Sequence, residues 1–237
     1  MFREYGPLAG NTVMLGYEYA PSFGDFLSRQ TAELDARYYM RLATNGVLAF
    51  RLRGFKSWGE FPGYLYFGGN SELRGYDYLQ FLGNKAFFAN AELRFPIIEA
   101  ALTPLGVIGG LRGVFFANMG AAGYEGLPMK VWSNETINYT PLLGFAPDQT
   151  GLGVVPVFGP TTAIPGFKLV DGRASYGIGL ETFALGFPIH FDWAWRTLFN
   201  KPWEDYLYSY NAILDGESSG SKWLRKPKFS IWIGYDF

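Results

Sequence analysis

The sequence predicts an all-β fold, an antiparallel transmembrane β-barrel with about eight strands. Three observations carry this prediction: an unusual composition, a repeated alternation of apolar and polar side chains, and connections of alternating length. The 237 residues include 31 glycines, 19% are aromatic and only 17% are charged, against about a quarter charged in an average domain. No apolar run reaches the roughly 18 residues of a membrane helix, so a transmembrane helix is excluded.

Composition also excludes several classes of function. The net charge of −1 provides no basic field for nucleic acid. The lack of cysteine excludes a disulfide scaffold, a thiolate zinc site and a cysteine nucleophile. His190 is the single histidine, which argues against a histidine-rich metal site or a Ser-His-Asp triad. We find no catalytic constellation, and we expect neither enzymatic activity nor a cofactor.

Alternation is clearest at 31–42, TAELDARYYMRL, where apolar or aromatic side chains occupy every second position. A strand places successive side chains on opposite faces, so this period indicates a strand with one apolar and one polar face. The same alternation recurs at 86–95, 187–196 and 228–237, and more weakly at 11–19, 47–55, 107–118 and 173–183. Each strand is close to the roughly 9–11 residues needed to cross a bilayer at a tilt of about 45°.

The connections between these strands alternate between short and long. We expect a tight turn at 43–46, a Pro-bounded turn near 96–106 and a short turn near 184–186. Long loops are expected at 56–84, 119–172 and 197–227. Short periplasmic turns on one side and long extracellular loops on the other are typical of outer-membrane barrels.

A soluble barrel of the lipocalin type has the same period with its apolar face inward, so alternation by itself leaves the direction open. Two features favour lipid on the outside. Trp and Tyr lie near the strand ends on the apolar face, as interfacial girdles do. The opposite face collects charges, which suits a water-filled interior. These charged residues are Glu33, Asp35, Arg37, Arg41, Arg51, Arg53, Glu92, Arg94, Arg112, Glu181, Asp192 and Arg196.

Residues 66–97, YFGGNSELRGYDYLQFLGNKAFFANAELRFPI, carry a family resemblance. The run Leu73-Arg74-Gly75-Tyr76 resembles the Arg-Gly-aromatic motif at the tip of the long sixth extracellular loop of the bacterial surface antigen family, the BamA-type outer-membrane insertase and translocase superfamily. Residues 91–96 resemble the strand that follows that loop, and 173–180 resemble the fourteenth strand. Residues 113–120 are similar to the family's Phe-x-Asp-x-Gly, with Asn118 in the position of the Asp.

The resemblance implies an anchoring role for the loop. In the family the loop folds back into the barrel and its Arg contacts acidic residues of the inner wall, which implies a pair between Arg74 and Glu92 here. Guanidinium and carboxylate form charge-assisted hydrogen bonds, Gly75 allows a tight turn, and Phe116 would pack beside the pair. Because Asn118 replaces an acidic residue, the resemblance implies a weaker anchor.

The C-terminal strand resembles the family's targeting signal. Ser230 occupies its polar position, Tyr235 and Phe237 occupy its two aromatic positions, and Trp232 stands where the family usually has glycine. The resemblance implies recognition by the barrel-assembly machinery, a place in the bacterial outer membrane and contact with its lipid. It also implies insertion of outer-membrane proteins or protein translocation, with unfolded outer-membrane or secreted proteins as clients and without nucleotide or metal. Two other functions stay open: a barrel that anchors an N-terminal enzymatic or binding domain, and a passive pore.

The family's barrel has sixteen strands and follows periplasmic domains. Residues 1–237 would then be a single barrel domain corresponding to strands nine to sixteen, and we expect a truncated frame without the periplasmic domains and signal peptide. An open half-barrel leaves two sheet edges unsatisfied in lipid, which is costly. A closed eight-stranded barrel and a dimer of half-barrels are the alternatives.

Overall fold

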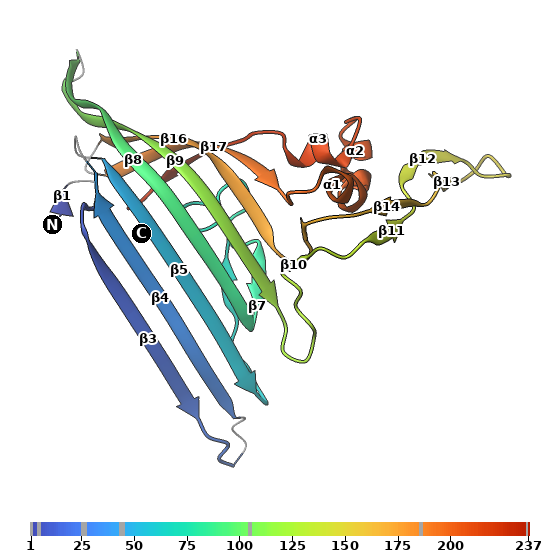
Figure 1. The fold of residues 1–237 in the computed structure, drawn as a ribbon, viewed down its shortest axis with the longest axis horizontal. Coiled ribbons are helices and arrows are strands. Elements are labelled where there is room, and N and C mark those ends of the chain that lie inside the picture. Colours follow the sequence, from blue (N-terminus) through green and yellow to red (C-terminus); the bar gives the residue numbers. More distant parts are fainter. Residues whose placement is uncertain are drawn as a thin grey trace. The chain divides into compact units, whose positions relative to one another are not determined.

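The computed structural model describes residues 2–3, 6–24, 28–42, 46–103, 106–184, 187–235 and 237. Eight strands among them form one antiparallel sheet with the order β18-β17-β16-β9-β8-β5-β4-β3 (Figure 1). Its strands are β3 (Gly10–Ala20), β4 (Arg29–Arg41), β5 (Val47–Gly59), β8 (Lys85–Thr103), β9 (Gly106–Gly123), β16 (Arg173–Ala184), β17 (Phe187–Thr197) and β18 (Lys228–Ile233). Among the described residues, no helix is long and apolar enough to cross a membrane. The all-β barrel class predicted from the sequence is confirmed.

The chain divides into two compact units. The sheet unit comprises Met1–Met129, Ala174–Trp195 and Pro227–Phe237, and the loop unit comprises Lys130–Arg173 and Arg196–Lys226. The sheet unit also contains the short pair β1 (Phe2–Arg3) and β2 (Gly6–Pro7). Each unit is described by itself below.

The faces of the sheet are inverted relative to a soluble protein. On β8 the side chains of Phe88, Asn90, Glu92 and Arg94 are buried, and the residues between them are more accessible. On β18 the apolar residues of the segment 229–233 are at least half exposed, whereas Trp232 between them is buried. An apolar outer face with a polar inner face is the pattern of a barrel in lipid. The lipocalin alternative requires the opposite arrangement.

The predicted Pro-bounded turn near 96–106 is wrong. β8 continues through this segment to Thr103 and pairs with β9 as far as Gly106. The register shifts between Pro96 and Ile98, and such a bulge accommodates a proline that has no N–H to donate to the ladder. Residues 104–105, which connect the two strands, lie outside the described residues. So do 43–45 of the predicted turn at 43–46 and 185–186 of the turn near 184–186.

The loop predicted at 56–84 is more structured than expected. β5 extends to Gly59, and the loop contains the paired strands β6 (Leu65–Phe67) and β7 (Phe81–Gly83). Apolar side chains of the loop pack in one cluster with residues of β5 and β8. The cluster contains Phe55, Leu65, Phe67, Leu73, Tyr76, Ala86 and Phe88. The loop buries these apolar side chains by returning to the inner face of the sheet. In a loop that extended away from the sheet, the same side chains would stay exposed to solvent.

Two further segments predicted as plain loops carry secondary structure in the loop unit. β9 already extends to Gly123 beyond the predicted loop start, and three nested pairs then form a long hairpin arm. These pairs are β10 (Trp132–Ser133) with β15 (Lys168–Leu169), β11 (Ile137–Tyr139) with β14 (Thr162–Ile164), and β12 (Leu142–Pro147) with β13 (Val154–Phe158). The segment 197–227 contains α1 (Lys201–Leu207), α2 (Ser209–Leu214) and α3 (Gly220–Leu224). Asn200 caps α1 through the Trp203 amide, and Ser219 caps α3 through the Lys222 amide.

The last strand is shorter than predicted. β18 ends at Ile233, and the Gly234 amide donates to the carbonyl of Pro188. Tyr235 is 60% exposed, whereas Phe237 is only 4% exposed and belongs to a cluster with residues of β4 and β5. The alternation predicted for 228–237, which would place both aromatic residues on one face, therefore does not extend to Phe237. Once the ladder with β17 ends, the chain is free to turn Phe237 into the interior.

Candidate functional site

The Arg-Gly-aromatic motif lies in the loop between β6 and β7, against the inner face of the sheet. Leu73 bonds back to Gly69 through main-chain groups and its side chain is fully buried. Gly75 adopts a φ of 87°, a conformation that L side chains rarely adopt. The hydroxyl of Tyr76 donates to the carbonyl of Ala174 at 3.2 Å. The buried side chain of Leu73 and the hydroxyl of Tyr76 thus hold the loop against the sheet. Arg74 lies between these two residues in the sequence.

Arg74 is 1% exposed and binds two carboxylates. Its Nη2 lies 2.7 Å from Oε1 of Glu92 on β8, and its Nε lies 3.3 Å from Oδ2 of Asp192 on β17. The guanidinium carbon is 4.5 Å from the ring centroid of Phe116 on β9, within the range of a cation–π contact. The structure therefore brings Arg74, Glu92 and Phe116 together, as the family resemblance implies.

The charges around Arg74 form a balanced network. Arg94, the neighbour of Glu92 on the inner face, places Nη2 2.7 Å from Oε2 of Glu92. Two guanidinium groups therefore face two carboxylates, and all four side chains are nearly inaccessible to solvent. Buried charges are tolerated only when they are paired and hydrogen-bonded. The water-filled interior predicted from the sequence is wrong at this place, because the loop fills it.

Asp192 is the partner that sequence reasoning missed. The resemblance implies a weaker anchor because Asn118 replaces an acid, but a carboxylate from β17 binds the same arginine. Alternation within 187–196 places Asp192 on the same face as the other charged residues, and this position was the sequence signal that could have identified it as a partner of Arg74. Its proximity to Arg74 depends on how the loop returns to the sheet, which alternation does not describe.

Asn118 serves a different part of the loop. Its Oδ1 accepts a hydrogen bond from Nδ2 of Asn90 at 2.9 Å, and its own Nδ2 donates to Oγ of Ser175 at 3.4 Å. Nδ2 of Asn90 also donates to the main-chain carbonyl of Glu72 at 2.5 Å. This uncharged chain of amides joins β8, β9 and β16 and supports the loop backbone next to Arg74.

The three residues predicted for the C-terminal targeting strand lie in different surroundings. Ser230 stands opposite Asp192 in the ladder between β17 and β18. Phe237 lies against Arg94, with 5.1 Å between its ring centroid and the guanidinium carbon. Tyr235 is exposed and stays apart from this network. The structure therefore brings Ser230 and Phe237, but not Tyr235, to the neighbourhood of the anchored loop.

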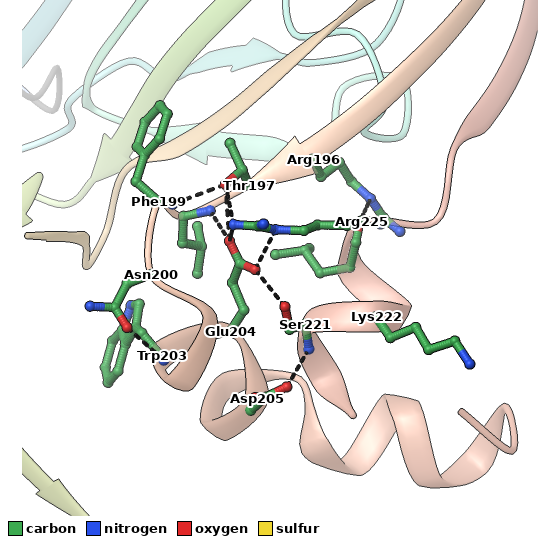
Figure 2. Close-up of polar contacts among 12 residues, drawn as sticks. Arg196, Thr197, Phe199, Asn200, Trp203, Glu204, Asp205, Ser221, Lys222 and Arg225 are labelled. Atoms are coloured by element: carbon green, nitrogen blue, oxygen red, sulfur yellow. Dashed lines mark hydrogen bonds and ion pairs between the residues drawn. The ribbon is translucent and has the colours of Figure 1, made fainter. Parts of the chain in front are cut away.

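A second buried cluster lies in the loop unit and centres on Glu204 of α1 (Figure 2). Its carboxylate accepts hydrogen bonds from the Thr197 hydroxyl at 3.0 Å, the Leu198 amide at 2.7 Å and the Ser221 hydroxyl at 3.1 Å. Nε of Arg225 lies 2.7 Å from Oε2 of the same carboxylate. Because both oxygens are occupied, the cluster fastens α1 and α3 to the segment after β17 and offers no vacant ligand position. No motif in the sequence marks it.

A buried lysine closes the base of the hairpin arm in the same unit. Lys168 is fully buried, and its ammonium group donates to the carbonyls of Glu135 at 2.5 Å, Gly166 at 3.1 Å and Ile164 at 3.3 Å. Main-chain oxygens thus replace water around the charge. Sequence reasoning did not single out this residue either.

The Arg74 network holds the loop to three strands of the sheet, β8, β9 and β17, and pairs every charge that it buries. Searches among curated proteins and among solved structures found no match. A family model, the Omp85 superfamily domain, matches residues 4–237. This range contains the anchored loop, its partner strands and the C-terminal strand, so we conclude that the chain belongs to the Omp85 superfamily.

Proposed function

We propose that this chain inserts proteins into the bacterial outer membrane or moves proteins across it, and that β18 is the strand on which clients assemble. Members of the Omp85 superfamily are outer-membrane proteins that generally act as insertases or translocators rather than as enzymes. The proposal assigns this general activity to the present chain. It requires no nucleotide, metal or cofactor.

The observation that carries the proposal is the anchoring of Arg74 between Glu92 and Asp192. It ties a long loop to the inner wall close to β18, which is an edge strand of the described sheet. An edge strand presents unpaired main-chain groups on which an extended segment can add by strand addition. A loop anchored beside such an edge is suited to control access to it.

The packing around the loop supports a protein-handling role over a passive pore. A selective pore needs a hydrated path lined by charges, but Arg74 and the three charged residues around it are paired and nearly inaccessible to solvent. The alternative of a barrel that only anchors another domain is an outcome of the experiment below.

The proposed partners follow from the same assignments. Outer-membrane lipid would contact the exposed apolar residues on β18, Phe229, Ile231 and Ile233. The barrel-assembly machinery would recognise Ser230, Tyr235 and Phe237 in the chain before it folds. Unfolded outer-membrane or secreted proteins would be the clients.

The test uses the full chain reconstituted in lipid vesicles, with a urea-unfolded outer-membrane protein as client. We expect the client to reach its heat-modifiable folded form faster than in empty vesicles. The Arg74→Lys variant should lose most of this acceleration, because an ammonium group cannot bind both carboxylates as a guanidinium does. The matched control is Arg29→Lys, which alters an exposed ion pair with Glu18 and should leave the rate unchanged.

Each alternative has its own signature in this experiment. Steady ion conductance without faster client folding would indicate a passive pore and refute the proposal. Neither conductance nor faster folding would favour an anchor for another domain. Equal acceleration by the Arg74→Lys variant and the wild-type chain would refute the role of the loop.

A further inference from the structure

We infer that Asp192 couples the Arg74 loop to the attachment of the last strand, so that loosening one loosens the other. This inference rests on the proposed function, in which β18 is the strand that receives clients. Asp192 and Trp232 then act as positioning residues: they hold the client-receiving strand in a place that depends on the loop.

The coupling is located at a single oxygen atom. Oδ2 of Asp192 accepts a hydrogen bond from Nε1 of Trp232 at 2.7 Å and lies 3.3 Å from Nε of Arg74. The three side chains are buried, with exposed fractions of at most 8%. Hydrogen bonds to a carboxylate in a dry environment are strong and influence one another. A displacement of the loop arginine therefore changes the acceptor that holds the indole.

Trp232 is fixed in its position on β18 from several sides. Its ring stacks on His190 of β17 with 3.6 Å between centroids and 2° between planes. His190 in turn hydrogen-bonds through Nε2 to the carbonyl of Gly234 at 2.8 Å. The guanidinium carbon of Arg74 lies 5.8 Å from the indole centroid. The indole thus contacts both the neighbouring strand and the loop.

Side-chain contacts matter more for β18 than for other strands because its ladder is short. The ladder between β17 and β18 covers residues 189–194 of β17, whereas the ladder between β4 and β5 covers residues 29–41 of β4. Because β18 has about half as many paired residues as β4 has with β5, a single buried hydrogen bond contributes a larger share of the free energy that holds β18 to the sheet. Loss of the contact with Asp192 should therefore release β18 before it affects the rest of the sheet.

The test measures amide hydrogen exchange in the full chain reconstituted in lipid bilayers. The Trp232→Phe variant removes the indole N–H but keeps an aromatic ring next to His190. Because a hydrogen bond to a charged group contributes enough to shift an equilibrium by about tenfold or more, we expect the β18 amides that pair with β17 to exchange at least about tenfold faster. Exchange in β4 and β5 should stay unchanged. The matched control is Trp195→Phe, whose ring stacks on Tyr176 of β16 and which should not change exchange in β18.

The Arg74→Lys variant tests the coupling itself, because it removes the guanidinium group that pairs with Asp192 and leaves the sequence of β18 intact. We expect it to accelerate exchange in β18, and we expect the double variant with Trp232→Phe to exchange no faster than the faster single variant. Effects that multiply in the double variant would show two independent contacts and overturn the inference. Unchanged β18 exchange in Arg74→Lys, or equally accelerated exchange in all strands, would overturn it as well.

The client-folding assay separates failure of this inference from failure of the proposed function. If Arg74→Lys impairs client folding but leaves β18 exchange unchanged, the function stands and the coupling is wrong. If the variants loosen β18 as expected but client folding does not depend on this chain, the coupling stands and the proposed function is wrong.

Discussion

Replacement of Glu92 by glutamine tests the buried charge network most directly. Glu92 is the carboxylate that forms ion pairs with both Arg74 and Arg94, with nitrogen–oxygen distances of 2.7 Å to each. Glutamine has nearly the same shape, so the change removes a charge without opening a cavity. Asp192, which contacts Arg74, is then the carboxylate that remains in the network of two buried guanidinium groups.

The expected loss in the free energy of unfolding follows from the burial of the charges and the distances between them. Two unit charges about 4 Å apart interact with about 4 kcal/mol at an effective dielectric constant of roughly 20. Breaking a buried pair by removing one partner typically costs about 3–5 kcal/mol, because the other charge stays buried. Asp192 and the ring of Phe116 still compensate part of the charge on Arg74. We therefore expect Glu92→Gln to lower the free energy of unfolding by about 3–5 kcal/mol.

The matched control is Glu18→Gln, which removes an ion pair of shorter distance at an exposed place. Glu18 lies 2.6 Å from Arg29, with side chains 57% and 37% exposed, and such pairs contribute less than about 1 kcal/mol. Urea titration of both variants in lipid vesicles, followed by tryptophan fluorescence and by heat modifiability, measures the two free energies. If the two variants lose similar stability, burial does not govern the strength of these pairs and the reasoning is wrong.

Three further substitutions test other parts of the structure. A methyl group added by Gly177→Ala would overlap the carbonyl oxygen of Trp193, so we expect destabilisation beyond the roughly 1–3 kcal/mol of ordinary overpacking, measured by urea titration. Gly16→Ala, whose methyl group would have its nearest atom at 3.7 Å, should unfold at the same urea concentration as the wild-type chain. Glu204→Gln should make α1–α3 sensitive to protease while the sheet keeps its heat modifiability, because this carboxylate accepts hydrogen bonds from both sides of the cluster; intact helices after protease treatment would contradict this. Lys168→Met should expose the hairpin arm to cleavage, since three carbonyls lose their donor; an unchanged digestion pattern would show that the arm does not depend on the lysine.

Much of the fold could be predicted from the sequence because strand alternation is a local property. Side chains two residues apart share a face, so segments such as 86–95 reveal both the strand and the side chains that share each face without knowledge of their neighbours. The period places Glu92 and Asp192 on the polar face of their strands, and the gathered charges and the aromatic residues near the strand ends indicate that this face is the inner one. The Arg-Gly-aromatic motif likewise identified Arg74 within a segment that has no alternation of its own.

The loop unit could not be predicted in the same way. Its strands are two to six residues long and its helices five to seven, too short for a period to emerge from a window of sequence. Their stability comes from contacts such as those of Glu204 and Lys168, which join segments far apart along the chain. Short elements of this kind depend on tertiary packing more than on their own propensity.

By itself the sequence determined the strands, the inner and outer faces of the sheet and the arginine of the loop, since each is encoded by neighbouring residues. Only the tertiary structure decided that Asp192 is the second partner of Arg74, that Trp232 shares its carboxylate and that Phe237 turns inward. These three features depend on which segments, far apart in the sequence, come into contact on the inner face of the sheet. The need to pair every buried charge and to cover every buried ring selects that arrangement, and this condition applies to the folded chain as a whole.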